Sequence, residues 1–374
     1  MTNKILKLFA NCKTVSGYKR SILIDFHFKC YYFLPNQINN IISQKYIDLQ
    51  NISAVYKEKD VKHVAEYIDY LKSKQTLFEC DIDEVDFFID IPMDVNIPYL
   101  LHNIIIEIND NYINEYIDNI NTISCKHIQL KWYKHVSIEK IKFFLNKINN
   151  SFIKSVDVVF PLTKEFDFSI VEKMLYAYKR IFKIYITDCE QNKDLLKIPK
   201  EYSKNNIILV NHKVSSNQCC GFINKKNFII DLPFFNESLQ FNTCLNRKIC
   251  IDSEGYIKNC PSMQHHYGHI SDTTLAEAID KPGFKDCWFI KKDDIDVCQD
   301  CEFRHICTDC RAFIKDSNNI YSQPAKCGYN PYIAKWQNEE GWISVEQWRK
   351  ENPEWEKQAI ELRELHKKYI AINE

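Results

Sequence analysis

The spacing of the cysteines constrains this chain more than any other feature. Sixteen of its 374 residues are cysteine, and eleven of these lie in the stretch 219–327. Two CxxC pairs, Cys298 with Cys301 and Cys307 with Cys310, are separated by five residues. Two residues between thiolates let one tight turn direct both sulfurs at the same ion or cluster. The stretch therefore predicts metal ligation in place of a conventional apolar core.

Three more cysteines extend this series. Cys327 follows the second pair, while Cys244 precedes Gly255 by ten intervening residues and Gly255 precedes Cys260 by four. Seven ordered thiolates exceed the needs of one four-ligand centre. The five cysteines outside the stretch 219–327 stand alone and are expected to be small buried residues: Cys12, Cys30, Cys80, Cys125 and Cys189.

The cellular compartment decides whether clustered thiols pair with each other or bind metal. Residues 1–7 lack the apolar run of a signal peptide, so we expect a cytoplasmic protein with reduced thiols. No stretch approaches the ~20 apolar residues of a membrane span. A formal net charge of −1 gives no general attraction to nucleic acid or membrane, so neither is expected as a partner. With 7 glycines and no GxGxxG or GxxxxGK[ST], glycine-rich phosphate loops are disfavoured.

Four regions follow from the local patterns. Residues 1–98 predict a small strand-and-helix domain, with a half-buried strand from Ile22 to Cys30, a hairpin turn at Gly17 and a helix capped by Asp60. Residues 99–215 alternate apolar strand candidates with helical patterns, one of them opened by a capping box at Ser169. The strand candidates begin near residues 103, 127, 155, 181 and 206.

Strands that are apolar on both faces and separated by helices predict parallel βα units with helices outside, as a partial barrel or an open sheet. Residues 216–334 hold the clustered cysteines. Residues 335–374 are charged and helix-favouring, and we expect a helix packed back on the body or, as the alternative, a partner-binding helix. Four tryptophans punctuate this tail: Trp336, Trp342, Trp348 and Trp355.

The ordered series from Cys244 to Cys327 resembles the SPASM domain, the carboxy-terminal module of radical-SAM peptide-modifying enzymes. The pattern Cys-x10-Gly-x4-Cys, Cys-x2-Cys-x5-Cys-x2-Cys and a final Cys carries the resemblance, although the last pair commonly has three intervening residues in that family. The resemblance implies two auxiliary 4Fe–4S clusters. It places one on Cys298, Cys301, Cys307 and Cys327, and the other on Cys244, Cys260 and Cys310.

The second cluster then needs a fourth ligand. Cys250 is the first candidate because it lies between two implied ligands, and Cys219 and Cys220 are the next. An iron left open for a peptide or a small molecule is the third alternative. Zinc is the competing metal, although familiar zinc sites with two CxxC pairs separate them by ~15–20 residues rather than five.

The radical-SAM motif itself is missing. Nowhere does the chain contain CxxxCxxC, and residues 109–114 after the first predicted strand of the βα region hold no cysteine. The expected fold is therefore α/β: a partial (βα) barrel resembling a degenerate radical-SAM barrel, a small N-terminal α+β domain and a C-terminal Cys-rich SPASM domain. Reductive cleavage of S-adenosylmethionine is not expected.

A SPASM protein without that motif is similar to the SPASM partner of grasp-with-spasm systems. The resemblance implies a role in maturing a ribosomally synthesised precursor peptide beside an ATP-grasp peptide ligase. Two hypotheses remain: a redox enzyme acting on the peptide, or a non-catalytic module that presents the peptide to the ligase. The N-terminal domain invites comparison with winged-helix readers of leader peptides, to which a peptide adds a strand.

Several polar residues lie beside the cysteines. Arg304, Arg311 and Lys248 are expected to offset the negative charge of thiolate-bound clusters. A histidine group after Cys260 could suggest a metal site, but its members are expected to be ordinary turn and strand residues: His265, His266 and His269. No Ser-His-Asp arrangement, paired carboxylates or HExxH is present, so the sequence nominates no catalytic acid, base or nucleophile.

Overall fold

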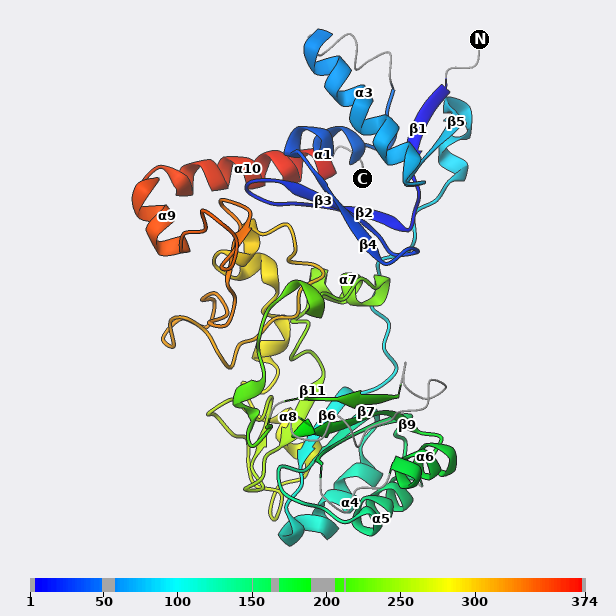
Figure 1. Ribbon diagram of the computed structural model, residues 1–374, viewed down its shortest axis with the longest axis vertical. Coiled ribbons are helices and arrows are strands. Elements are labelled where there is room, and N and C mark those ends of the chain that lie inside the picture. Colours follow the sequence, from blue (N-terminus) through cyan, green and yellow to red (C-terminus); the bar gives the residue numbers. More distant parts are fainter. Residues whose placement is uncertain are drawn as a thin grey trace.

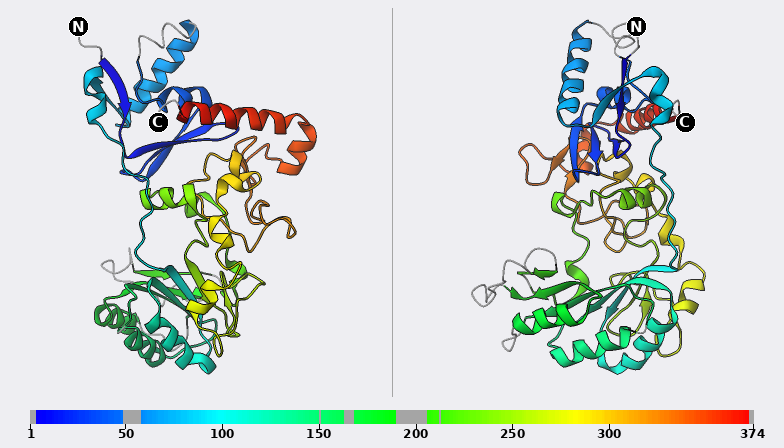
Figure 2. Two further views of the ribbon diagram at one scale, coloured as in Figure 1. Left: turned by 180° about the vertical axis from the view of Figure 1, so that it is seen from behind. Right: turned by 90° about the vertical axis from the view of Figure 1, so that its right-hand side faces the viewer.

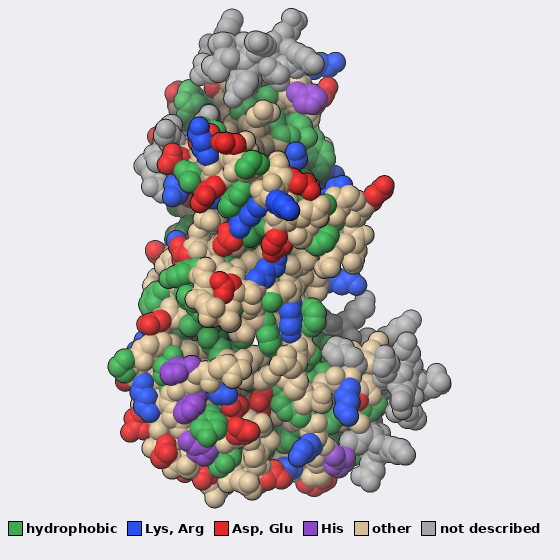
Figure 3. Space-filling model, turned by 90° about the vertical axis from the view of Figure 1, so that its left-hand side faces the viewer, with side chains coloured by type: hydrophobic (Ala, Val, Ile, Leu, Met, Phe, Trp, Pro, Cys, Tyr) green, Lys and Arg blue, Asp and Glu red, His purple; other side chains and the backbone are tan. Residues whose placement is uncertain are grey.

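The chain stacks three parts in the computed structural model, which describes residues 4–48, 58–149, 151–162, 168–189, 206–211 and 213–371. The N-terminal elements and the C-terminal helices lie at one end, and the large sheet with its helices lies at the other (Figure 1). The cysteine-rich loops lie between them, and the two views of Figure 2 show the same order. Basic and acidic side chains are interspersed on the face drawn in Figure 3.

Small antiparallel sheets build the N-terminal part. Strand β3 is the centre of the sheet β2-β3-β4, and β1 pairs with β5. The elements are β1 (Lys4–Leu8), β2 (Cys12–Ser16), β3 (Ser21–Asp25), β4 (Cys30–Leu34), α1 (Asn36–Ile42), α3 (Glu58–Ser73) and β5 (Leu77–Asp81).

Strand β3 is covered on both faces, so the prediction of one half-buried strand from Ile22 to Cys30 is wrong. The strand ends after five residues, and Cys30 begins the next strand of a hairpin. Leu23 packs against the helices of the N-terminal part, whereas Ile22 and Ile24 pack against Phe303 of the cysteine-rich segment. The alternating pattern could not reveal the second apolar partner because that partner lies far along the chain.

Gly17 lies in the turn between β2 and β3, as predicted. Its amide donates to the carbonyl of Arg20 at 2.9 Å. A Cβ at this position would lie 2.7 Å from the backbone nitrogen of Glu302. The glycine therefore lets the cysteine-rich backbone pass directly against the hairpin.

Two residues predicted to cap helices lie inside them instead. Helix α3 (Glu58–Ser73) includes Asp60, so Asp60 does not precede the helix. Helix α6 (Phe168–Ala177) likewise already includes Ser169. Side-chain capping preferences locate a helix start only to within a residue or two.

An open seven-stranded sheet forms the other end of the molecule. Its order is β10-β9-β8-β7-β6-β11-β12, and all neighbours are parallel except β11 and β12. Each of the five strand candidates of residues 99–215 forms a strand of this sheet. The elements are β6 (Leu101–Glu107), α4 (Ile113–Thr122), β7 (Cys125–Lys131), α5 (Ile138–Ile148), β8 (Ser155–Pro161), α6, β9 (Ile181–Thr187) and β10 (Ile207–Leu209).

Only one face of this sheet is apolar, which corrects the expectation of two apolar faces. Ile104, Ile128, Val158 and Ile184 join the core formed with α4, α5 and α6. Because side chains alternate along a strand, their neighbours point to the other face. There the paired residues form a mixed row across β6 to β9: Ile105, Gln129, Asp157 and Lys183.

The sheet also recruits strands from the cysteine-rich segment. Strand β11 (Lys248–Ile251) pairs in parallel with β6, and β12 (Ile257–Lys258) follows it as the edge strand. Two cysteines of the series, Cys244 and Cys260, flank these strands closely in sequence. The sheet thus fixes the position of two of the predicted ligands.

The C-terminal tail packs back on the molecule through its tryptophans. Helices α9 (Val345–Glu351) and α10 (Trp355–Ala371) follow the cysteine-rich segment. Trp348 stacks on Tyr332 with ring centroids 4.4 Å apart, and Arg349 lies over the ring of Trp355 at 3.8 Å. Within the described ranges, no helix has both the length and the apolar character needed to cross a membrane.

Candidate functional site

Eight cysteines line two neighbouring cavities in the cysteine-rich segment. We call the first cavity site A; four thiols line it, those of Cys298, Cys301, Cys307 and Cys327. We call the second cavity site B; it holds four further thiols, those of Cys220, Cys244, Cys260 and Cys310. Cys307 also reaches the wall of site B, so the two cavities share a boundary.

Tight turns hold the thiols of site A. The amide of Cys301 donates to the carbonyl of Cys298 at 3.0 Å, closing the turn of the first CxxC pair. Val297 enters this turn at φ +66, a conformation that costs free energy for a β-branched residue. Cys298 and Cys307 are buried, and burial raises the pKa of each thiol to about 11. A nearby positive charge opposes this rise in pKa, but burial outweighs it.

A lysine supplies that positive charge at site A. Lys292 is 4% exposed, and its Nζ lies 3.6 Å from Sγ of Cys307 and 3.8 Å from Sγ of Cys298. Burial alone would lower the pKa of Lys292, but the thiols and Asp309 raise it well above its ordinary value. The remaining wall is largely aromatic and aliphatic and includes Phe228 and Trp336.

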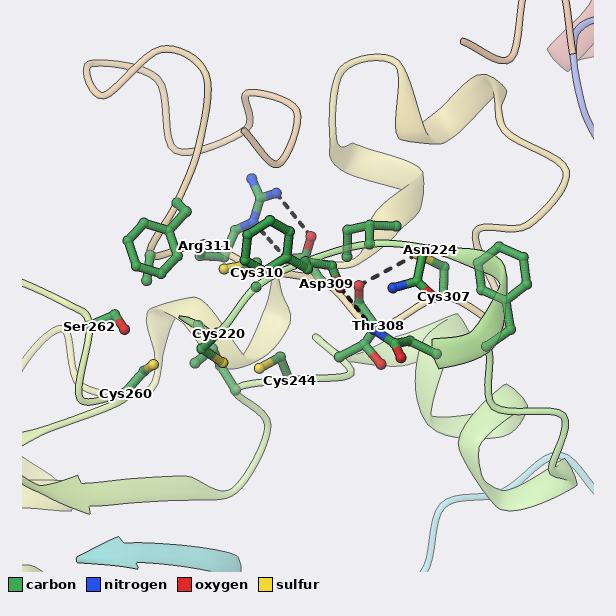
Figure 4. Close-up of a pocket in the computed structure, with 18 residues that line it drawn as sticks. Cys220, Asn224, Cys244, Cys260, Ser262, Cys307, Thr308, Asp309, Cys310 and Arg311 are labelled. Carbon is green, nitrogen blue, oxygen red and sulfur yellow. Dashed lines mark hydrogen bonds and ion pairs between the residues drawn. The ribbon is translucent and has the colours of Figure 1, made fainter. Parts of the chain in front are cut away.

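Site B brings together thiols from four separate stretches of chain. Figure 4 shows Cys220, Cys244 and Cys260 on one side of the cavity, with Cys310 across from them. Burial raises the pKa of Cys260 to about 12, and the neighbouring Cys244 contributes to the same shift. Lys248 donates from Nζ to Sγ of Cys244 at 3.4 Å, so this site also has a lysine beside a sulfur.

The loop that carries Cys220 is anchored against both sites. Gly221 has φ +82, and a Cβ there would lie 2.9 Å from Sγ of Cys310. Lys326 donates from Nζ to the carbonyl oxygen of Cys220 at 2.8 Å. Ile223 forms a bridge with Cys327 of site A. These contacts position the Cys220 thiol in site B. The seven-cysteine series alone supplies only three thiols there.

The other two candidates for a fourth ligand lie elsewhere. Cys250 is fully buried on β11, where burial raises the pKa of its thiol well above the ordinary value. Cys250 is not among the described residues that line either cavity. Cys219 is exposed, as is Cys220, but Cys219 is not among the described residues that line the cavities, and its thiol donates to the carbonyl of Ser216 at 3.3 Å.

A buried hydrogen-bond network joins the two sites. Asp309 accepts from Arg311 at 2.6 Å and from Nδ2 of Asn242 at 2.7 Å, and it lies 3.6 Å from Nζ of Lys292. Oδ1 of Asn242 in turn accepts from the amide of Cys244 at 3.0 Å. Positive partners hold the pKa of Asp309 below its ordinary value despite its burial. The chain from Lys292 through Asp309 and Asn242 thus spans site A to site B.

The charge of Arg311 opposes the rise in the pKa of the Cys298 thiol, as expected, but the hydrogen bonds of the two arginines have other partners than the thiols. Arg311 binds Asp309 and backbone carbonyls, and Arg304 binds Asp293 at 2.8 Å and the carbonyl of Cys301 at 3.0 Å. These hydrogen bonds go to oxygen, whereas Lys248 contacts a sulfur as expected. Lys292 was missed because nothing in its local sequence distinguishes it from a surface lysine.

The histidines after Cys260 are ordinary turn residues. His269 bonds Oγ of Ser271 at 2.8 Å and the carbonyl of Glu254 at 2.9 Å. His266 lies against Tyr256 with ring centroids 4.5 Å apart. A Cβ on Gly255, at φ +90, would lie 2.5 Å from Nε2 of His269, which explains glycine at this point of the cysteine series.

A buried carboxyl group lies on the strand between β11 and β7, outside the linings of both sites. Glu107, at the carboxyl end of β6, accepts hydrogen bonds from the Tyr133 hydroxyl and from the amide of Ser253. Burial raises the pKa of Glu107 above its ordinary value. Burial and Glu107 raise the pKa of Tyr133, with smaller effects from Cys219 and Cys220. Ligands of open α/β sheets bind at such carboxyl ends, so this pair is a candidate missed by the sequence.

The donor chemistry of both sites suits iron–sulfur clusters. Each offers four thiols and one lysine, and the cavities enclose about 230 Å³ at site B and about 20 Å³ at site A. The smaller volume is room for about one water molecule, so a cluster at site A would need a wider cavity than this one. Within the described residues, no three His, Cys, Asp or Glu side chains form a group suited to a single metal ion.

Comparisons with known proteins leave the family open. No protein-family model and no curated protein matches the chain. A hexahistidine-tagged anSMEcpe with bound AdoMet aligns over 62% of this chain and 93% of its own, with 11% identity and a TM-score of 0.34. SuiB of Streptococcus suis bound to S-adenosylmethionine aligns over 82% and 96%, with 10% identity and a TM-score of 0.26. SuiB bound to precursor peptide SuiA gives 11% identity and 0.25. Values this low assign the chain to no family.

Proposed function

We propose that this chain is an iron–sulfur protein with one 4Fe–4S cluster on site A and one on site B. A single observation supports this most strongly: the seven cysteines of the series divide between two cavities in the way the SPASM resemblance implies. Site B adds Cys220 as a fourth thiol. Such a cluster, when bound, accepts and releases one electron at a time.

The proposed ligands at site B are Cys220, Cys244, Cys260 and Cys310. This choice replaces Cys250, whose sulfur lies on a buried strand outside both cavities. Four protein ligands at each site would occupy every iron. The sites then suit electron transfer or structural support better than direct binding of a substrate to iron.

We further propose that the chain acts in the maturation of a ribosomally synthesised precursor peptide beside an ATP-grasp ligase. The resemblance of the cysteine series supports this, together with the loss of CxxxCxxC. The outer edge of β4 offers a place for the peptide, since β4 is an edge strand and its Phe33 is 42% exposed. Glu107 and Tyr133 are the candidate polar contacts near site B.

A second candidate function is a non-catalytic escort that presents the peptide to the ligase. The docking of the N-terminal sheet on the cysteine-rich segment favours it, because site A and the β4 edge then belong to one packed unit. In this role the clusters, or zinc in their place, would be structural.

Metal analysis after purification without oxygen tests the first proposal. We expect a brown protein with about eight irons and matching sulfide per chain. Colourless protein with stoichiometric zinc and no sulfide, even after attempted reconstitution, would reject the clusters and leave the escort function.

The ligands of site B are tested by matched substitutions. Cys220→Ser is expected to lose about half of the iron, whereas Cys250→Ser and the exposed control Cys219→Ser are expected to keep it. Loss of iron in Cys250→Ser alone would return Cys250 to the ligand set.

The peptide function is tested by combining the chain with an ATP-grasp ligase and its precursor peptide. A change in peptide mass that needs both the chain and a reductant supports the redox role. Peptide binding without any mass change beyond that of the ligase alone supports the escort.

A further inference from the structure

Each of the two sets of four cysteines has one lysine ammonium beside at least one of its sulfurs. At site A, Nζ of Lys292 lies 3.6 Å and 3.8 Å from two sulfurs, and the side chain is almost fully buried. At site B, Nζ of Lys248 lies 3.4 Å from Sγ of Cys244. The two lysines come from unrelated elements, a short turn and the first residue of β11. The same chemical solution therefore arises twice in one chain.

The ammonium of Lys292 is held in place by a carboxylate. Asp309 lies 3.6 Å from it and is fixed by Arg311 and by Asn242. A lysine buried in this way costs desolvation free energy unless negative groups surround it. The surrounding negative groups here are the Asp309 carboxylate and the thiolates of site A, so the charge of Lys292 is matched to thiolates in their metal-binding form.

We propose that Lys292 and Lys248 are positioning residues that set the reduction potentials of the two centres, one lysine for each. This inference rests on the proposed iron–sulfur function. Four thiolates outweigh the positive charge of a four-iron core, and reduction adds one more electron from an external donor. A nearby ammonium stabilises the added negative charge, so it favours the reduced state and raises the potential.

The two effects should be largely separate. Lys292 contacts sulfurs of site A, and Lys248 contacts a sulfur of site B. The network from Lys292 through Asp309 to Asn242 reaches site B only through one ion pair and two hydrogen bonds. Removal of either lysine is therefore expected to shift its own centre more than the other.

Redox titration of the loaded protein with dithionite, followed by visible and EPR spectra, measures these potentials. Lys292→Met keeps the length of the side chain and removes its charge. We expect at least a tenfold lower ratio of reduced to oxidised protein at a fixed potential for one centre, which is about 59 mV for one electron. Lys292→Arg keeps the charge and is expected to recover most of the shift.

Lys248→Met provides the second, independent variant and should lower the potential of the other centre. Lys258→Met is the matched control, because Lys258 is a nearby lysine whose Nζ pairs with Asp252 at 2.6 Å. It is expected to change the ratio of reduced to oxidised protein at a fixed potential by less than twofold at either centre. Should Lys292→Met fail to fold, Lys248→Met still tests the inference at the other centre.

Three results would overturn the inference: unchanged potentials in loaded Lys292→Met and Lys248→Met, equal shifts in Lys292→Met and Lys292→Arg, or both lysine variants shifting the same centre. Failure of the proposed function looks different, since the unsubstituted protein would then hold no iron and sulfide at all. Iron and sulfide analysis of that protein precedes the titration and separates the two cases.

Discussion

The sheet and the cysteine-rich segment solve the problem of burial in opposite ways. In the sheet, regular strands satisfy the backbone groups, and the side chains against the helices are almost all aliphatic or aromatic. In the cysteine-rich segment, much of the backbone is irregular and the buried set is rich in polar groups. Glu302, Asp309, Arg311 and Lys292 are all at most 4% exposed.

This difference shows what each region needs in order to hold its shape. The sheet core gains stability from apolar area alone, which requires no ligand. The cysteine-rich segment buries thiols and charges that are favourable only as matched sets. The two regions nevertheless share a core, since Ile249, Ile251 and Trp288 join the cluster beneath the sheet.

Removal of the metal is expected to have the largest effect and to separate the two regions. Chelation of the loaded protein should raise the amide-exchange rates of residues 290–334 by orders of magnitude. The reason is that buried thiolates are stable only while a metal cation binds them. Strands β6 to β9 should keep their protection. Hydrogen exchange with mass spectrometry measures both at once, and simultaneous loss in β6 to β9 would contradict the comparison.

The buried ion pair between the N-terminal hairpin and the cysteine-rich segment comes next. Nε of Arg20 lies 2.7 Å from Oε1 of Glu302, whose side chain is fully buried and also accepts from Tyr329 at 2.5 Å. Arg20→Met should cost about 3–5 kcal/mol of unfolding free energy near pH 7, since it leaves the carboxylate without its cation. Denaturant unfolding measures the loss.

This cost should shrink in acid. Burial already raises the pKa of Glu302, and loss of Arg20 raises it further. The native state of Arg20→Met then holds a proton that the unfolded chain releases, so its stability falls as pH rises from 5 to 7. The control is Lys315→Ala at the exposed pair with Glu346, where less than about 1 kcal/mol is expected. Equal losses in the two variants would show that burial is not the cause.

A cavity in the sheet core tests the other region. Ile184 is fully buried on β9, and Ile184→Ala should cost about 2–5 kcal/mol without reducing iron content. Phe182→Ala on the same strand is the control, because Phe182 is 54% exposed and should change stability by no more than about 0.5 kcal/mol. Iron loss in Ile184→Ala that exceeds the loss of folded protein would instead show that the sheet core controls the sites.

The sequence predicted the sheet better than the site, and the reason is physical. Strand candidates are visible locally because runs of isoleucine and valine need only their own neighbours to form strands. The division of the cysteines could be stated only through a family resemblance. Cys220 was predicted only as a second choice after Cys250, and Lys292 was not predicted, because tertiary contacts, with Cys310 in one case and with Asp309 in the other, give them their place. The mixed second face of the sheet was missed because of local sequence: Gln129, Asp157 and Lys183 stand between apolar residues, so each strand looked apolar on both faces.

The smallest expected effect concerns a buried histidine of the C-terminal helix. His366 is 9% exposed and lines a cavity with Arg304 and His305. Burial, aided by Arg304, lowers the pKa of His366 to about 4. The unfolded chain binds a proton at this residue near pH 6.5, so its contribution to stability is complete above that value and is lost as pH falls from 6.5 toward 4.

His366→Gln should therefore leave the thermal midpoint at pH 7 nearly unchanged and flatten its dependence on pH. The slope of unfolding free energy against pH between 6 and 4.5 should fall by up to one bound proton relative to the unsubstituted protein. Comparing the two slopes cancels the acid sensitivity that both proteins share through their thiols. Identical slopes would mean that His366 is charged in the folded state. Nε2 of His366 has no hydrogen-bond partner among the described residues. A charged His366 would require an acceptor close to this nitrogen in the folded protein.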